Sequence, residues 1–203
     1  MTLTRDIDLC RECLEFENQE RINPVEKPFA KYKVEEKWQR KPAEVLFIAE
    51  SPPWNGKQRY FYNQDVDEQR TNLRKEVLEH LQLNSLDEFK GKGFALIDAI
   101  KCRLNKRQKK NVPLKVLEVC SARFLRREIS ELNPKVIFVL GNSAKDALQQ
   151  LPEFQDLQHH KITDSYDKML SGYRVILCVY PGGQTRQHKS RIRLTFSKVG
   201  SKT

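Results

Sequence analysis

Four short apolar runs stand out along the chain and predict its β-strands. They lie at 45–49, 94–97, 136–140 and 175–179. Near-continuous apolar runs, without a polar residue at every second position, are typical of central parallel strands that are covered on both faces. The pattern therefore predicts a buried sheet with a layer of helices on each side.

Apolar residues at helical spacing fill the segments between these runs. One helical face is formed by Leu73, Val77, Leu78 and Leu81. A second face is formed by Leu117, Cys120, Phe124, Leu125 and Ile129. This second helix is predicted to end before Asn133-Pro134, because proline disfavours the helical conformation of the residue before it. A third helix is predicted at 143–151.

The alternation of strands and helices predicts the fold class. Strand–helix–strand order implies parallel strands joined by right-handed crossovers. We expect a single α/β domain over residues 1–203, a three-layer sandwich with a central four-stranded parallel sheet. Residues 14–43 are charged and punctuated by proline, so we expect an irregular arm there that wraps the domain.

Polar, glycine or proline residues follow each predicted strand. The four turns are 50–53, 98–103, 141–142 and 180–183. Binding sites in open parallel sheets lie outside the carboxyl ends of the strands. We therefore expect these turns to converge on one functional site.

The chain is basic, with 37 lysine and arginine residues against 27 aspartate and glutamate residues and a net charge of +10. This excess favours an anionic partner, nucleic acid above all, although a generally basic, solvated surface would have the same composition. No apolar run approaches the length of a membrane span, and the N-terminal segment is charged where a signal peptide is apolar. We expect a cytoplasmic, nucleoid-associated monomer without membrane contact.

Five cysteines, an odd number, argue against a disulfide framework in a chain without a signal peptide. Cys10 and Cys13 form a CxxC pair, a spacing that allows both thiolates to bind one metal centre. Cys102 and Cys120 would complete a four-thiolate site for zinc or for a [4Fe–4S] cluster. Alternatively, both are ordinary buried thiols. Cys178 lies within an apolar strand and is expected in the core.

Three stretches of the sequence resemble the iron–sulfur branch of the uracil-DNA glycosylases, often called family 4. They are the CxxC opening, the segment from Lys101-Cys102-Arg103 through Cys120 to FLRREISELNPKVIFVLGNSA, and VLFIAESPP, which resembles the first active-site motif of that family. The resemblance implies a uracil-DNA-glycosylase-like fold and base excision from DNA. It also implies a [4Fe–4S] cluster, whose ligands would be Cys10, Cys13, Cys102 and Cys120.

Several turn residues match the active site of this family. Glu50 matches the motif glutamate, and a carboxylate there would position water or stabilise positive charge on the sugar. Phe61, in an aromatic cluster that continues with Tyr62, matches the phenylalanine that stacks on the flipped base. Ser51 and Asn142, on the first and third turns, are further candidates to bind the substrate.

Two positions depart from the family pattern. The family has asparagine at the position of Asp98, and an amide can accept from uracil N3–H while it donates to O4. An ionised Asp98 can only accept, so it would repel uracil O4 unless it is protonated, and hypoxanthine or another deaminated or damaged base becomes the alternative substrate. Tyr180 stands where the family has the histidine that donates to the departing base. A tyrosine hydroxyl still donates a hydrogen bond but stays neutral.

Basic residues follow the second and fourth predicted strands and predict contacts with DNA phosphates. The candidates are Arg103, Lys106, Arg107 and Arg186. The sequence thus predicts a DNA glycosylase that acts by hydrolysis in DNA repair. The altered Asp98 and Tyr180 leave open a catalytically weak or inactive iron–sulfur relative that binds nucleic acid, and the cysteines leave open a zinc-bound structural module.

Overall fold

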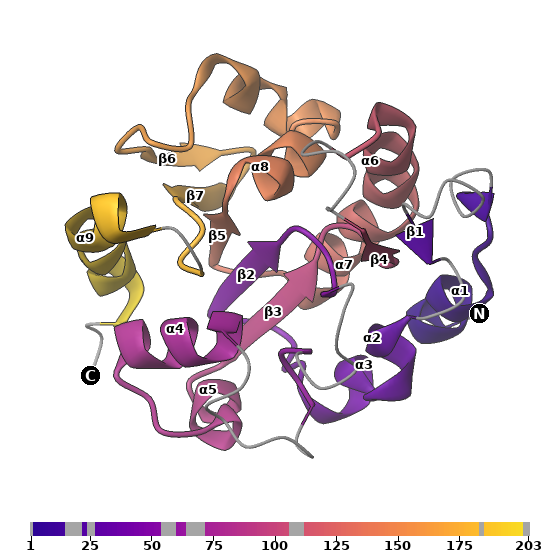
Figure 1. The fold of residues 1–203 in the computed structure, drawn as a ribbon, viewed down its shortest axis with the longest axis horizontal. Helices are drawn as coiled ribbons and strands as arrows, with labels where there is room; N and C mark the ends of the chain where they lie inside the picture. Colours follow the sequence, from indigo (N-terminus) through magenta and orange to yellow (C-terminus); the bar gives the residue numbers. More distant parts are fainter. Residues whose placement is uncertain are drawn as a thin grey trace.

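A five-stranded mixed sheet forms the centre of the protein, as the computed structural model shows (Figure 1). The structure describes residues 2–14, 22–23, 27–53, 60–63, 72–105, 112–182 and 185–200. In the order β3-β2-β5-β7-β6, the sheet contains strands β2 (Val45–Ala49), β3 (Phe94–Asp98), β5 (Val136–Leu140), β6 (Asp167–Leu170) and β7 (Tyr173–Cys178). The four predicted strands are confirmed, and the pairs among β3, β2, β5 and β7 are all parallel.

The fifth strand, β6, corrects the prediction of a four-stranded, wholly parallel sheet. It pairs antiparallel with β7 through a hairpin in which Leu170 lies opposite Tyr173. The two residues between them, Ser171 and Gly172, both have positive φ angles of 50° and 86°, as the tightest hairpin turns require. β6 lies at the sheet edge with Lys168 and Met169 exposed, so no apolar run marks it in the sequence.

Parallel register brings the carboxyl ends of the strands to one edge of the sheet. Ala49 at the end of β2 lies opposite Asp98 at the end of β3. Leu140 at the end of β5 lies opposite Cys178 at the end of β7. The turns after all four strands therefore leave from the same edge, as the sequence predicts.

Helices cover both faces of the sheet. α4 (Asn72–Leu81) and α9 (Lys189–Gly200) pack together on one face, and α8 (Asn142–Leu148) packs on β5 and β2. The predicted long helix is present as α6 (Leu114–Cys120), a π-helical turn η4 (Ser121–Leu125) and α7 (Arg126–Leu132). Further helical segments between residues 72 and 200 are α5 (Leu86–Gly91), η5 (Pro152–His159) and η6 (Thr185–His188). Among the described residues, none of the helices is long and apolar enough to cross a membrane.

A cluster of phenylalanines joins the sheet to the layer of α5 and α9. The ring of Phe47 in β2 lies 5.1 Å from Phe138 in β5, 5.7 Å from Phe89 in α5 and 6.0 Å from Phe196 in α9, measured between ring centroids. Large, fully buried rings at these separations stabilise the fold through apolar burial and edge or offset contacts. This cluster holds the strands on which the functional turns depend.

The described residues of segment 14–43, for which an irregular arm is predicted, include short helices and a strand. The arm contains α2 (Pro28–Lys31) and α3 (Val34–Lys37), which lie beside α1 (Leu3–Leu9) in Figure 1. A short strand, β1 (Ile22–Asn23), pairs antiparallel with β4 (Arg103–Leu104). Trp38 also stacks on Tyr62, with ring centroids 5.5 Å apart. The arm thus contacts the domain at two places. One is β4, and the other is the segment 60–63 after β2, called the aromatic loop below.

Candidate functional site

Three strand ends bring Glu50, Asp98 and Tyr180 into one region at the carboxyl edge of the sheet. The turn after β2 is tied to the turn after β3, because Ala99 N donates to Ala49 O at 2.8 Å and Ile100 N donates to Glu50 O at 2.9 Å. Burial, together with the negative charges of Asp98 and Glu50, raises the pKa of Tyr180 to about 12. Two carboxyl groups and one phenol therefore share this edge.

Asp98 is buried, with 7% of its surface exposed. The pKa of its carboxyl is raised to about 7, chiefly by burial. Glu128 and Glu50 also raise this pKa, whereas Lys101 and Arg103 oppose the rise. Low polarity and neighbouring carboxylates both penalise the ionised form. Asp98 therefore changes its protonation state near neutral pH.

A buried ion pair lies next to Asp98. Lys101 Nζ lies 2.5 Å from Glu128 Oε2, both side chains are fully or almost fully buried, and Lys101 Nζ also donates to Asp98 O. The pair joins the turn after β3 to α7. The sequence does not reveal this ion pair, because a lysine and a glutamate that are distant along the chain give no local signal.

Two glycines hold the Tyr180 ring. A Cβ atom at Gly182 would lie 2.7 Å from Tyr180 Cε1, and one at Gly141 would lie 3.1 Å from Tyr180 Cβ. Gly141 also has a φ of +88°, a conformation that side chains other than glycine rarely adopt. The ring, 38% exposed, thus lies against backbone at the mouth of the site.

For the base excision that the sequence predicts, Gly182→Ala is expected to lower the rate about threefold, because the new methyl group displaces the Tyr180 ring and small displacements of a reacting group slow catalysis. Single-turnover excision kinetics would measure this. Gly91→Ala is the matched control, because nothing lies within 4 Å of a Cβ there. Equal rates for the two variants would show that the position of the ring is unimportant.

The aromatic loop after β2 divides its rings between the core and the site. Tyr62 accepts from Leu96 N at 2.7 Å and donates to Leu96 O at 3.0 Å, so it covers the free edge of β3. Phe61 packs edge-on against Phe89, with centroids 5.4 Å apart. Tyr60 stacks on Tyr32 at 5.2 Å, and the charge of Asp98 helps to raise the pKa of Tyr60, after burial.

Phe61, the residue predicted to stack on the base, is buried in the phenylalanine cluster. Tyr60 and Tyr62 are buried as well, and after burial itself the charge of Asp98 helps to raise the pKa of both. Arg74 of α4, itself buried, fixes the loop by donating to Asn63 O at 2.8 Å and to Phe61 O at 3.3 Å. Three consecutive aromatic residues look alike in sequence, so only the structure shows that they pack on different partners, namely Tyr32, Phe89 and Trp38.

The other predicted site residues have different positions. Ser51 is half-buried in the turn after β2, and Asn142 is exposed at the first position of α8. Arg103 is buried and donates to Pro53 O, so it holds the 50–53 turn instead of lying on the surface for a phosphate. Lys106, Arg107 and the side chain of Arg186 lie outside the described residues.

The four predicted cysteine ligands come together from three segments. Cys10 and Cys13 follow α1, Cys102 precedes β4, and Cys120 ends α6, where the π-helical turn begins. All four thiols are buried. Burial raises the pKa of Cys102 to about 12, and the charges of Cys120, Cys13 and Cys10 contribute in the same direction. The four side chains therefore form one electrostatic group.

Basic groups surround these thiols. Arg123 Nη1 lies 3.9 Å from Cys10 Sγ and 2.6 Å from Glu12 Oε1. Lys27 is buried and donates to Asp8 O at 3.0 Å and to Cys10 O. Burial lowers the pKa of Lys27, while the thiols of Cys102 and Cys10 act to raise it. Positive groups around four thiols fit a centre that carries negative charge.

Four thiols are the donor set of both iron–sulfur clusters and structural zinc. Over the part of the chain that the structure describes, no three or more histidine, cysteine, aspartate or glutamate side chains form a group that could hold a metal ion. Cys10, Cys13, Cys102 and Cys120 are nevertheless buried thiols that act on one another electrostatically, and they are the residues that would hold a thiolate-bound cluster.

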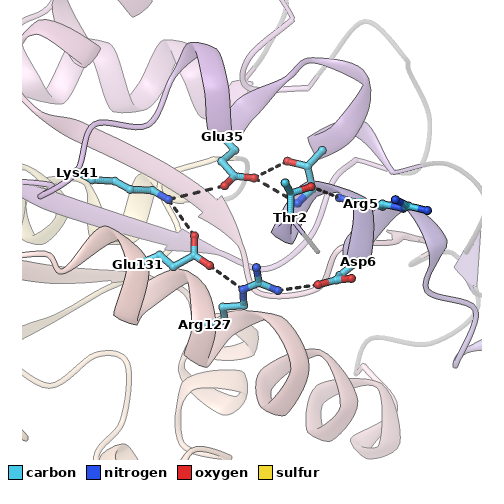
Figure 2. Close-up of polar contacts among 8 residues, drawn as sticks. Thr2, Arg5, Asp6, Glu35, Lys41, Arg127 and Glu131 are labelled. Carbon is cyan, nitrogen blue, oxygen red and sulfur yellow. Dashed lines mark hydrogen bonds and ion pairs between the residues drawn. The ribbon is translucent and has the colours of Figure 1, made fainter.

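An ion-pair network fastens α1, which leads into the CxxC pair, to the rest of the domain (Figure 2). Arg127 of α7 lies 2.6 Å from both Asp6 and Glu131. Lys41 lies 2.9 Å from Glu131 and 3.7 Å from Glu35. Glu35 accepts from the Thr4 hydroxyl at 2.6 Å. The network therefore positions the helix that precedes Cys10 and Cys13.

Arg127→Ala is expected to lower the free energy of unfolding by about 1 kcal/mol, because the network is partly exposed to solvent. It should also speed amide hydrogen exchange in residues 3–9, since α1 loses its link to α7. Arg126→Ala is the control, because Arg126 pairs with Glu153 in η5 instead. Equal exchange rates in the two variants would show that α1 is held by its apolar contacts.

Comparison with known families supplies one match. The family model described as uracil DNA glycosylase superfamily matches residues 38–198. No curated protein matches the chain. The matched segment includes every strand of the central sheet and the three residues Glu50, Asp98 and Tyr180 at its carboxyl edge.

Proposed function

Because the chain belongs to the uracil DNA glycosylase superfamily, we propose that it hydrolyses the N-glycosidic bond of a deaminated or damaged base in DNA. The observation that carries this proposal is the convergence of Glu50, Asp98 and Tyr180 on one edge of the sheet. A glycosylase must read the edge of a flipped base and stabilise charge as the base leaves. These three residue types provide the necessary groups.

Each of the three side chains has a proposed role. Glu50 positions a water molecule and stabilises the positive charge that develops on the sugar. The water oxygen bonds to C1′ as the bond from C1′ to the base nitrogen breaks and the base leaves with the electron pair. The proton that the water loses ends on the departing base, so the products are the free base and an abasic sugar. Tyr180 donates a hydrogen bond to the departing base. Asp98 binds the base edge.

The protonation of Asp98 decides which base edge it binds. A protonated carboxyl offers one O–H donor and one carbonyl acceptor, so it can match the N–H and C=O groups of uracil or hypoxanthine as an amide does. The pKa of about 7 makes this form available near neutral pH. Tyr60, stacked on Tyr32, is the proposed aromatic wall for the flipped base.

The four cysteines are proposed to hold a [4Fe–4S] cluster. The support is the convergence of four buried thiols, the basic groups around them and the resemblance to the iron–sulfur branch. The cluster would supply a cross-link between the N-terminal segment and the segments that end at Cys102 and Cys120. The nearby turn after β3, which carries Asp98, would be ordered by that cross-link.

The DNA-binding surface is proposed to continue along the start of α9. Lys189, Arg191 and Arg193 are exposed on this helix, and η6 connects it to the turn that carries Tyr180. Clustered positive charge beside the site would bind phosphates and set the strand in register without reading its sequence. A DNA partner also implies a location with the nucleoid.

A panel of oligonucleotides tests the proposed activity. Single- and double-stranded substrates that contain uracil, hypoxanthine or oxidised bases would be incubated with the cluster-loaded protein, and alkali-labile abasic sites would be counted. Excision of at least one lesion above that of intact DNA is expected. Tight DNA binding without excision of any base would instead support the second candidate, a catalytically inactive nucleic-acid-binding relative, which the Asp98 and Tyr180 departures favour.

Tyr180→Phe is expected to slow excision of the preferred base about fivefold, because a neutral hydrogen bond contributes about 1 kcal/mol. The pKa of about 12 keeps the hydroxyl protonated, so the effect should not change between pH 6 and pH 9. Single-turnover rates at both pH values measure it. Tyr173→Phe, at the start of β7, is the control, and equal rates in both variants would remove the Tyr180 hydroxyl from the mechanism.

A further inference from the structure

Lys27 is buried beside the cysteines, and within the described part of the chain it forms no ion pair with a carboxylate. Its side chain is 5% exposed, and its ammonium donates to two backbone carbonyls, those of Asp8 and Cys10. Among the described residues, no carboxylate lies within ion-pair distance of Lys27 Nζ. The neighbouring groups that favour its positive charge are the Cys102 thiol, then Cys10 and the more distant Asp8 carboxylate, whereas the charge of Arg11 opposes it.

A buried ammonium is costly unless an opposite charge compensates it. Removing a charge from water costs several kcal/mol, and hydrogen bonds to carbonyls offset only part of this. Four thiolates that bind a metal centre would add negative charge beside Lys27, where the described residues offer only the distant charge of Asp8. The lysine therefore matches the site as it would be when the thiols are deprotonated and loaded.

We propose that Lys27 is the charge-compensating residue of the cysteine centre, and that its ammonium determines how firmly the centre is retained and how easily it accepts an electron. The inference rests on the proposed cluster and deepens it. Lys27 bonds to the carbonyl of Cys10, a ligand residue, and lies in electrostatic reach of Cys102 from another segment. The buried Lys27 side chain thus acts on cysteines from two separate segments of the chain.

Arg123 is the second, weaker member of this arrangement. Its Nη1 donates to Cys10 Sγ at 3.9 Å, but its side chain is 45% exposed and also pairs with Glu12. Water and Glu12 screen its charge. We therefore expect changes at Arg123 to act in the same direction as changes at Lys27 and to be smaller.

The test compares Lys27→Met with Lys37→Met, an exposed lysine of α3 on the same arm. Both proteins would be reconstituted anaerobically with iron and sulfide. Loss of visible absorption in the presence of an iron chelator gives the retention rate, and a redox titration followed by electron paramagnetic resonance gives the reduction potential. Arg123→Gln is measured in parallel, and circular dichroism verifies the fold of each variant.

Lys27→Met should lose its cluster at least tenfold faster than Lys37→Met. Its reduction potential should fall, because the added electron is no longer compensated; a tenfold change in the one-electron equilibrium corresponds to about 59 mV. Arg123→Gln should show a smaller change in the same direction, and it serves as the test if Lys27→Met does not fold. Retention and potential equal to those of Lys37→Met would overturn the inference. Failure of the unaltered protein to bind iron and sulfide would instead overturn the proposed cluster.

Discussion

Asp98→Asn is expected to raise uracil excision about tenfold at pH 8, while it changes the rate little at pH 6. The carboxyl is protonated below its pKa of about 7, and only that form matches the donor and acceptor of uracil. At pH 8 about one molecule in ten carries the proton, whereas at pH 6 about nine in ten do. An amide in its place is competent at every pH.

Single-turnover excision of uracil from pH 5.5 to 9 measures this effect. The unaltered protein should lose activity as the pH rises through 7, and Asp98→Asn should not. Asp87→Asn, an exposed aspartate in α5, is the matched control and should follow the unaltered protein. The same loss of activity above pH 7 in Asp98→Asn would show that another group titrates, and a lower uracil rate in this variant would show that Asp98 does not bind the base edge.

The same substitution should also stabilise the fold at alkaline pH. The folded-state pKa of Asp98 lies above its ordinary value of 3.8, so the folded state binds the proton more tightly than the unfolded state. The stability gained from this proton is present at low pH and is lost as the pH rises from about 4 through 7. Asp98→Asn should therefore gain on the order of a few kcal/mol over the unaltered protein at pH 8 and little at pH 4. Urea unfolding at both pH values measures the difference.

Cys102→Ala is expected to abolish cluster binding and to lower the free energy of unfolding by several kcal/mol, because the binding energy of a structural metal centre contributes directly to folding. Cys102 connects the turn after β3 with β4, which pairs with β1 of the arm. Loss of the centre should therefore release α1 and the CxxC segment. Iron and sulfide analysis, visible absorption and urea unfolding measure these changes.

Cys178→Ala is the matched control for the cysteine experiment. Cys178 is as deeply buried as the four predicted ligands but lies within β7. Its variant should keep iron and sulfide while it loses some stability from the missing atoms. Iron retained equally by both variants would contradict the ligand assignment. Zinc without sulfide in the unaltered protein would identify a zinc-bound structural module in place of a cluster.

The central sheet was predictable because strands that are buried on both faces appear in the sequence as near-continuous apolar runs. The four apolar runs correspond to β2, β3, β5 and β7, and their shared direction follows from the helices between them. The edge at which Glu50, Asp98 and Tyr180 meet also follows, because parallel strands must end on the same side. β6 escaped prediction because an exposed edge strand needs few apolar residues.

The directions and partners of polar and aromatic side chains depended on segments far apart in the chain. Arg103 is basic in sequence, yet it is buried against Pro53. Tyr60 and Phe61 are adjacent, but Tyr32 and Phe89 draw them into different surroundings. No local pattern records such contacts, since each requires two or three segments to meet.

The departures at Asp98 and Tyr180 and the four cysteines were visible in the sequence, because they concern the identity of single residues. Their chemical state was not visible. The pKa of Asp98 depends on burial and on the charges of Lys101, Glu128, Arg103 and Glu50, and Lys27 reaches the cysteines from the arm. Residue order thus specifies the chemical groups and the sheet edge, whereas folding supplies the low-polarity surroundings and distant charges that set how those groups behave.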